Sequence, residues 1–437
     1  MASEWTLADA AHLLRRAGFG GSYEQVNQLH ALGREGAIDW LIEYDAVPDP
    51  SAQTAGQLGL DTGKPAGVIQ AQLYRMAAST RPLQEKLAWF WHGHFVSALG
   101  KAPMELMPVQ METWRARASG GFREFLSAMY RDPAMLFYLD NNTNVVGKPN
   151  ENFAREVMEL FTLGVGNYSE NDVREAARAL TGWTARRTSG QSIFVSRRHD
   201  RGVKTVLGVT GNLDAEDLMD ILYVQPACAP HVCGRLYEYF VGPAAPEVDL
   251  ATLVGAWQQS DGDIREVLHV LFRLAAFWAP ENRVARIKSP VEYGIGLYQR
   301  LQVPLTAENL RRLSGALRNM GQVPLMPPDV AGYPVNLEWA GTSALLSRYN
   351  AAYALLYTLP ASLLEALLSG IDVSTSRRLL DGLLLRLGPL ALGDASDAAV
   401  LGYLDAGGYP ASNRVRVNLK ARGALHLIAA TPEYQLN

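Results

Sequence analysis

The stretch that decides the fold of this chain is residues 140–164, which read DNNTNVVGKPNENFAREVMELFTLG. A loop rich in asparagine leads through Lys148-Pro149 into a segment whose apolar residues recur every three or four positions. That spacing is typical of an amphipathic helix and predicts one over 151–163. Because the same spacing recurs through most of the chain, the sequence predicts a mainly α-helical protein.

Working outward from that stretch, we expect one large multi-helix globular domain over 1–437 with a small inserted β-hairpin. The exception to the helical pattern is 193–208, where two short β-prone runs flank Asp200-Arg-Gly202 and predict the hairpin. A weak seam near 211 would separate a motif-bearing half, which holds the hairpin, from a second helical half.

The composition, 48% hydrophobic and 19% charged, is ordinary for a folded soluble protein. The net charge of −4 gives no nucleic-acid footprint, and no apolar run reaches the ~18 residues of a membrane span. The first twenty residues resemble the start of a fold helix more than an export signal. Cys228 and Cys233 would lie roughly 140° apart around a helix, a poor geometry for a disulfide. We therefore expect free thiols, a cytoplasmic protein, and no nucleic-acid or membrane partner.

Several cofactor signatures are absent from the chain. There is no Walker loop, dinucleotide fingerprint, H-E-x-x-H or paired C-x-x-C. The sequence therefore predicts neither a nicotinamide nor a P-loop nucleotide, and no structural zinc. A divalent metal ion held by carboxylates and histidine stays open as a cofactor.

The predicted helix over 151–163 has a polar face. Asn152, Glu156 and Glu159 fall within an arc of roughly 60°, because each residue turns the helix by about 100°. Two carboxylates and an amide on one face suit general acid–base chemistry or the binding of a hard cation. The alternative is a solvated face, with Arg155 paired to Glu159 and the acids near the positive end of the helix dipole.

A second candidate region holds His92-Gly-His94 within a helix expected over 82–99. Residues two apart on a helix diverge by about 200°, so both rings cannot easily bind one ion. His94 falls on the apolar face with Leu87 and Trp91, which makes it the histidine expected to face the interior. Its alternative role is that of a hydrogen-bonded core residue.

The predicted hairpin supplies positive charge near this polar face. Arg198 and Lys204 flank His199-Asp200, and arginine forks and a lysine suit a carboxylate or phosphate group. The alternative is a solvated basic hairpin with an Asx-type turn at Asp200.

Several further segments carry a family resemblance. They are HLLRRAGFG at 12–20, EKLAWFWHGHF at 85–95, the block 132–183, RHDRGVKTVLGVTGN at 198–212, KSPVEY at 288–293 and MGQVPLMPPDVAGYP at 320–334. Together they resemble the bacterial domain-of-unknown-function family 1800 over nearly the whole chain. Gly93 stands where the family usually has asparagine, and Tyr333 where it usually has tryptophan. The resemblance implies one shared architecture and no particular reaction. It also implies a candidate partner, because many relatives are encoded beside a sulfatase-like family.

The leading hypothesis is an enzyme for a small anionic or polar substrate, with a pocket between the helices over 82–99 and 151–182 and the hairpin as its roof. Metal-assisted hydrolysis or oxidation is favoured over metal-free acid–base chemistry. The rival is a non-catalytic binding or assembly protein in which the same residues form a structural network. The predicted catalytic and metal-binding set is His94, Glu156 and Glu159, and the predicted substrate-binding set is Asn150, Asn152, Arg155, Arg198, His199, Asp200 and Lys204.

Overall fold

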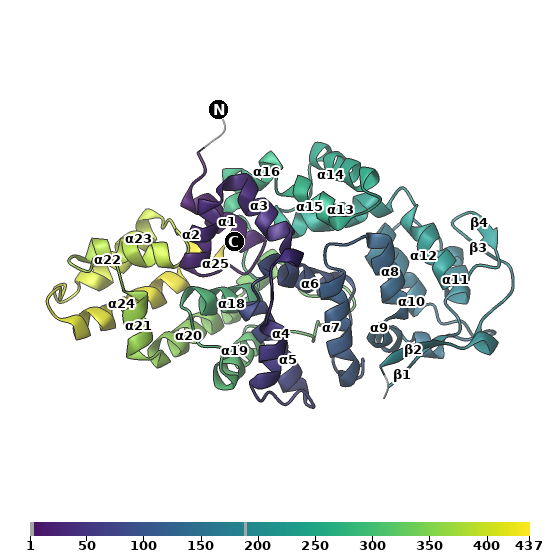
Figure 1. Cartoon of the computed structure of the whole chain (residues 1–437), viewed down its shortest axis with the longest axis horizontal. Coiled ribbons are helices and arrows are strands. Elements are labelled where there is room, and N and C mark those ends of the chain that lie inside the picture. The colour runs from purple at the N-terminus through teal and green to yellow at the C-terminus, as the bar shows by residue number, and fades with distance from the viewer. Residues whose placement is uncertain (1–3, 188–189) are drawn as a thin grey trace.

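The computed structural model describes residues 4–187 and 190–437, which form helices along most of their length (Figure 1). Within these residues the strands form two separate two-stranded antiparallel sheets. The prediction of a mainly α-helical fold with a small β-hairpin element is therefore confirmed. No described helix is both long enough and apolar enough to cross a bilayer.

The N-terminal helices lie in the middle of an elongated molecule, with the C-terminal helices at one end and both small sheets at the other (Figure 1). The N-terminal helices are α1 (Leu7–Arg16), α2 (Tyr23–Ala31), α3 (Gly33–Ile42), α4 (Ser51–Gln57), α5 (Pro65–Ala78), α6 (Pro82–His94) and α7 (Met107–Ala116). The next are α8 (Phe122–Arg131), α9 (Pro133–Tyr138), α10 (Asn152–Glu156), η4 (Val157–Leu163), α11 (Glu170–Ala179), α12 (Ala215–Tyr223), α13 (Cys228–Phe240), α14 (Glu247–Gln259) and α15 (Ile264–Leu271). The remainder are α16 (Ala275–Trp278), α17 (Pro280–Arg283), α18 (Pro290–Arg300), α19 (Ala307–Asn319), α20 (Thr342–Thr358), α21 (Ala361–Leu367), α22 (Ser376–Arg386), α23 (Asp394–Asp405), α24 (Arg414–Ala430) and α25 (Pro432–Gln435).

Helix α6 runs through the core, and each of its residues except Gly93 is buried. A helix that is covered on all sides has no single apolar stripe, so the spacing did not distinguish the two histidines correctly: His92 is buried as well as His94. It begins with Pro82 at the first turn, as predicted. It ends at His94, before the predicted end at residue 99, because the chain beyond it pairs elsewhere: the backbone N–H of Leu99 donates to the carbonyl of Leu325 (2.8 Å).

The helix predicted over 151–163 forms in two parts, α10 and then the π-helix η4. The wider turn brings the hydroxyl of Thr162 to the carbonyl of Val157 (2.6 Å). Carbonyl groups in the last turn of a helix lack partners within the helix. Two imidazole rings fill that role here, because Nε2 of His231 lies 2.9 Å from the carbonyl oxygen of Leu160 and Nε2 of His94 lies 3.0 Å from that of Phe161.

The strands do not pair across Asp200-Arg-Gly202, so the predicted hairpin turn is wrong. Instead β1 (Trp183–Arg186) pairs with β2 (Gln191–Phe194), and β3 (Lys204–Val206) pairs with β4 (Val209–Gly211). The second hairpin turns at Leu207-Gly208, where both residues have positive φ angles of 49° and 84°. A two-residue turn of that conformation matches the twist of the strands. Leucine is not a typical residue there, so the sequence pattern did not reveal the turn.

The buried apolar side chains form one continuous cluster that extends from α1 to α25. The division of the chain into one domain with a weak seam near 211 stays a prediction.

Candidate functional site

The asparagine-rich loop before α10 is fixed by its own side chains. Nδ2 of Asn141 donates to the carbonyl of Trp183 (3.1 Å), and Nδ2 of Asn144 donates to that of Ala177 (2.8 Å). Oδ1 of Asn144 accepts from the backbone N–H of Asn150 (3.0 Å). These bonds tie the start of α10 to α11 and β1, so the loop amides bind backbone groups.

Asn150 and Asn152, two of the predicted substrate-binding residues, shape the entry to α10. Oδ1 of Asn150 accepts from the backbone N–H of Asn152 (3.0 Å), and Nδ2 of Asn150 donates to the hydroxyl of Thr143 (3.1 Å). Nδ2 of Asn152 donates to Oδ2 of Asp140 (3.4 Å), which also forms an ion pair with Lys101 (2.8 Å). Both amides therefore have partners within the protein.

Glu156 and Glu159 lie on the half-buried side of α10 and η4, as the spacing predicts. The carboxyl group of Glu156 makes no hydrogen bond or ion pair with any residue that the structure describes. Burial raises the pKa of Glu156, and the nearby charge of Glu159 raises it further. Glu159 differs, because its Oε2 accepts a hydrogen bond from the hydroxyl of Tyr168. Two neighbouring carboxyl groups in unequal surroundings are the arrangement found in acid–base catalysts.

Tyr138, from another segment, is influenced by the charge of Glu156 and by that of Asp329. Burial raises the pKa of Tyr138, and the charges of Asp329 and Glu156 raise it further. Tyr138 is the last residue of α9. Asp329 lies in the proline-rich segment 324–334, which follows α19. Sequence reasoning missed Tyr138, Tyr168 and Asp329 as site residues. The only sequence signal was their presence in the family-like blocks 132–183 and 320–334.

His94 lies on the other, apolar side of η4 and does not join the two glutamates. Its Nε2 faces the carbonyl oxygen of Phe161 and therefore carries the proton and donates to it. Burial, together with the charges of Arg235 and His231, holds the pKa of His94 well below its usual value, so the ring is neutral. Its Nδ1 has no hydrogen-bond partner among the residues that the structure describes. His94 is thus the hydrogen-bonded core histidine of the alternative hypothesis.

The structure does not bring the predicted metal-binding set of His94, Glu156 and Glu159 together. Among residues 4–187 and 190–437, no three histidine, cysteine, aspartate or glutamate side chains are grouped so that they would hold a metal ion. The physical reason is that the imidazole binds a backbone carbonyl on the buried side of η4, while the carboxyl groups lie on the half-buried side.

Arg155 pairs with Glu170 and Glu151, and not with Glu159 as the solvated-face hypothesis supposed. Its Nη2 lies 2.7 Å from Oε2 of Glu170 and 3.5 Å from Oε2 of Glu151. The guanidinium group therefore joins α10 to α11 and is already paired with two carboxylates.

Four of the seven predicted substrate-binding residues, Arg198, His199, Asp200 and Lys204, bind other groups of the protein, and two of these, His199 and Asp200, bind the end of α11. Asp200 accepts a two-fold hydrogen bond from Arg178 (2.7 and 3.2 Å). Nδ1 of His199 lies 2.9 Å from the carbonyl oxygen of Thr181, and Nζ of the buried Lys204 donates to the carbonyls of residues 200 and 202 (2.6 and 3.1 Å). Arg198 likewise donates to the carbonyl of residue 142 (2.6 Å). None of the four forms a hydrogen bond or ion pair with Glu156 or Glu159 among the described residues.

Tyr333 and Gly93, the two departures from the family pattern, meet where the proline-rich segment covers α6. The hydroxyl of Tyr333 donates to the carbonyl of Val323 (2.7 Å), lies 3.3 Å from Nε2 of His92, and its ring stacks on Trp89. A Cβ atom at Gly332 would come within 2.8 Å of the carbonyl oxygen of Gly93. The close approach of these two backbones explains why glycine suits position 332.

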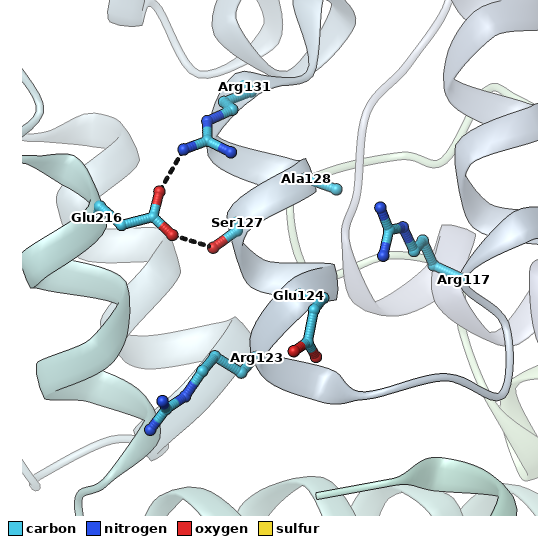
Figure 2. Close-up of a pocket in the computed structure, with 7 residues that line it drawn as sticks. All are labelled: Arg117, Arg123, Glu124, Ser127, Ala128, Arg131 and Glu216. Atoms are coloured by element: carbon cyan, nitrogen blue, oxygen red, sulfur yellow. Dashed lines mark hydrogen bonds and ion pairs between the residues drawn. The ribbon is translucent and has the colours of Figure 1, made fainter.

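A pocket of about 290 Å³ lies against α8 on the surface. Figure 2 shows Glu216 of α12 reaching Ser127 and Arg131 of α8. Arg123 is likewise opposite an acid, with its Nε 3.5 Å from Asp220. Most charges around this pocket are therefore neutralised within the protein.

An adjoining pocket of about 640 Å³ is lined in part by Asp132. This carboxyl group caps α9 and accepts hydrogen bonds from the backbone N–H of Met135 and from Nε2 of Gln110, both at 2.8 Å. Burial nevertheless raises the pKa of Asp132 to about 7. Sequence reasoning missed this residue, because Asp-Pro before a helix reads simply as a cap.

Residues 12–436 match the family model described as a protein of unknown function (DUF1800). The chain belongs to the DUF1800 family. The resemblance inferred from the sequence segments is thus confirmed, and the DUF1800 match assigns no activity. No curated protein matches the chain, and no solved structure matches it.

Proposed function

We propose that the protein is an enzyme that acts on a small polar or anionic substrate by metal-free general acid–base chemistry, with Glu156 as the group that donates and accepts the proton. The observation that carries the proposal is the state of Glu156: half-buried, with a raised pKa and without a hydrogen-bond or ion-pair partner among the described residues. A carboxyl group whose pKa is raised toward neutral pH transfers protons more effectively under physiological conditions.

Three further observations support this assignment. Glu159, with its hydrogen bond from Tyr168, supplies a second carboxyl group of different surroundings. Tyr138 supplies a phenol whose pKa is raised by burial and then by the charges of Asp329 and Glu156. The π-helical turn on which Glu159 lies is rare in proteins and is frequent at functional sites.

The experiment is a turnover assay on a panel of chromogenic carboxylate esters, phosphate esters, sulfate esters and glycosides. We expect turnover of at least one class by the wild type, and a loss of roughly 10²- to 10⁴-fold in Glu156→Gln. The matched control is Glu266→Gln, because Glu266 is exposed on α15; this variant should keep the wild-type rate. Far-UV circular dichroism checks that both variants fold. A Glu156→Gln rate equal to that of the wild type contradicts the assignment.

A second candidate function is that of a binding or assembly protein. It is favoured by the contacts of Arg155, Arg198, Asp200 and Lys204, whose polar groups bind other parts of the same chain. Complete absence of turnover across the panel, with a measurable affinity for one of its compounds, would favour this candidate over the enzyme.

The proposal includes a cytoplasmic location, which Cys228 and Cys233 support because both are free and buried. A sulfatase-like partner protein is proposed from the family resemblance alone.

A further inference from the structure

Six cationic side chains lie near one another where α1 packs on the protein, and they come from segments far apart in the sequence. Helix α1 contributes two, α6 one, the segment before α18 two, and α18 one. Among the described residues, one side-chain carboxylate lies among these cations, that of Glu292, and its negative charge raises the pKa of three of them. We call this group the buried cation cluster; its members are Arg15, Arg16, Lys86, Arg286, Lys288 and Arg300.

Most of these charges lack a counter-charge. Among the described residues, Lys86 is the only member of the cluster with an ion pair, and its partner is Glu292. Arg16 is 1% exposed, and its Nε and Nη1 have no hydrogen-bond partner. Arg300 is 3% exposed, and its Nε also lacks a partner. Nε of Arg15 is buried and unpartnered as well.

The members of the cluster repel one another. Burial lowers the pKa of Arg15 to about 9, and the charge of Arg300 contributes to that shift. Burial and then the charges of Arg300 and Arg15 hold the pKa of Lys288 well below its usual value. Removing an ion from water costs several kcal/mol unless an opposite charge compensates for it. The single carboxylate of Glu292 cannot compensate six cations.

Two members of the cluster reach the surface, and two glycines pack closely against a third. Arg15 and Arg286 are half-buried, so they connect the cluster to the surface. The guanidinium group of Arg300 lies between Gly20 and Gly388, where an added Cβ atom would come within 3.0 and 3.2 Å of Nη2. The buried hydroxyl group of Tyr239 has no hydrogen-bond partner among the described residues. The centroid of the Tyr239 ring lies 5.2 Å from Cζ of Arg286.

We propose that the buried cation cluster binds a tetrahedral oxyanion with two negative charges: free phosphate or sulfate, or the phosphate monoester group of a larger molecule. Guanidinium forks match the oxygens of such groups with paired hydrogen bonds. A doubly charged anion compensates more of the cluster than a single carboxylate. The hydroxyl of Tyr239 supplies one further donor. This site is separate from Glu156, and the proposal does not rest on the acid–base role of that residue.

The test is isothermal titration calorimetry of the full chain with inorganic phosphate, sulfate and methyl phosphate, in chloride buffer of matched ionic strength. The variants are Arg300→Met and, as matched control, Arg311→Met, because Arg311 is an exposed arginine on α19. We expect saturable binding to the wild type and to Arg311→Met. Arg300→Met should raise Kd by roughly tenfold or more, because hydrogen bonds to charged groups are among the strongest. Binding of methyl phosphate identifies an ester group as the ligand, whereas binding of the inorganic ions alone identifies the free ion.

A second readout separates specific binding from the general effect of these salts, which stabilise folded proteins by exclusion from their surfaces. In chloride, Arg300→Met should have a Tm no lower than that of the wild type, because it removes an unpaired buried charge. In phosphate, its Tm should rise less than those of the wild type and Arg311→Met. If Arg300→Met does not fold, Arg15→Met takes its place, because the guanidinium group of Arg15 makes no hydrogen bond to a described residue. An equal rise in Tm in all proteins, or no saturable binding to the wild type, overturns the proposal.

Discussion

The buried carboxyl group of Asp132 should make the stability of the protein fall as the pH rises toward neutrality. In the folded protein its pKa is about 7, against an ordinary value of 3.8. Between these two values the folded state keeps a proton that the unfolded state has released, so the free energy of unfolding decreases with increasing pH and levels off above about 7. Three pKa units at about 1.4 kcal/mol each give a loss of about 4 kcal/mol at most.

Asp132→Asn tests this reasoning, because an amide resembles the protonated acid and its oxygen still accepts from Met135 and Gln110. We expect the variant to match the wild type near pH 4 and to exceed its free energy of unfolding by up to about 4 kcal/mol above pH 7. Urea denaturation across that pH range measures the difference. The control is Asp405→Asn, since Asp405 is an exposed residue at the end of α23. A variant that is less stable than the wild type at pH 8, or a difference that does not change with pH, refutes the reasoning.

Three further predictions concern other buried groups. The depressed pKa of His94 means that the unfolded state binds the proton first below pH 6.5, so the stability that the neutral ring contributes above that pH is lost as the pH falls. Because the raised pKa of Asp132 acts in the opposite direction over the same range, urea denaturation of Asp132→Asn measures this loss, and constant stability of that variant from pH 7 to 5 would count against it. Burial raises the pKa of Cys228 and Cys233 to about 12, so a thiol reagent should label them only after unfolding, and rapid labelling of the native protein would be inconsistent with that burial. Lys86→Met breaks the ion pair with Glu292 and should cost about 3–5 kcal/mol in urea denaturation; Glu292→Gln leaves the buried cations without that carboxylate and should cost at least as much, so a smaller loss in Glu292→Gln would contradict the account.

Local patterns predicted the helices well, because apolar spacing and caps act over a few residues. The sequence Ser-Glu-Asn-Asp at 169–172 has the spacing of a capping box, and the structure forms one between Ser169 and Asp172. The π-helix η4 was beyond such reasoning, since its carbonyl groups bind the rings of His94 and His231, which lie far away in the sequence. The register of a helix end is then decided by tertiary contacts.

The candidate site was predictable only in part, for the same reason. The shared face of Glu156 and Glu159 follows from helix geometry, and the structure retains it. The partners of the charged residues between β2 and β3 could not be predicted from local sequence. Arg178, which binds Asp200, belongs to α11, and only the folded chain brings the two together. The buried cation cluster was also hidden, because Arg15 and Arg300 are brought together only by the packing of α1 against later helices.

The most direct test of the central claim is the pKa of Glu156 in the native protein. Carboxyl ¹³C NMR of the glutamate-labelled wild type, assigned with Glu156→Gln, measures it without knowledge of the substrate. We predict a midpoint above the ordinary value of 4.5, and a lower midpoint in Glu159→Gln, because that variant removes the neighbouring charge. A midpoint at or below 4.5 in the wild type would contradict the account.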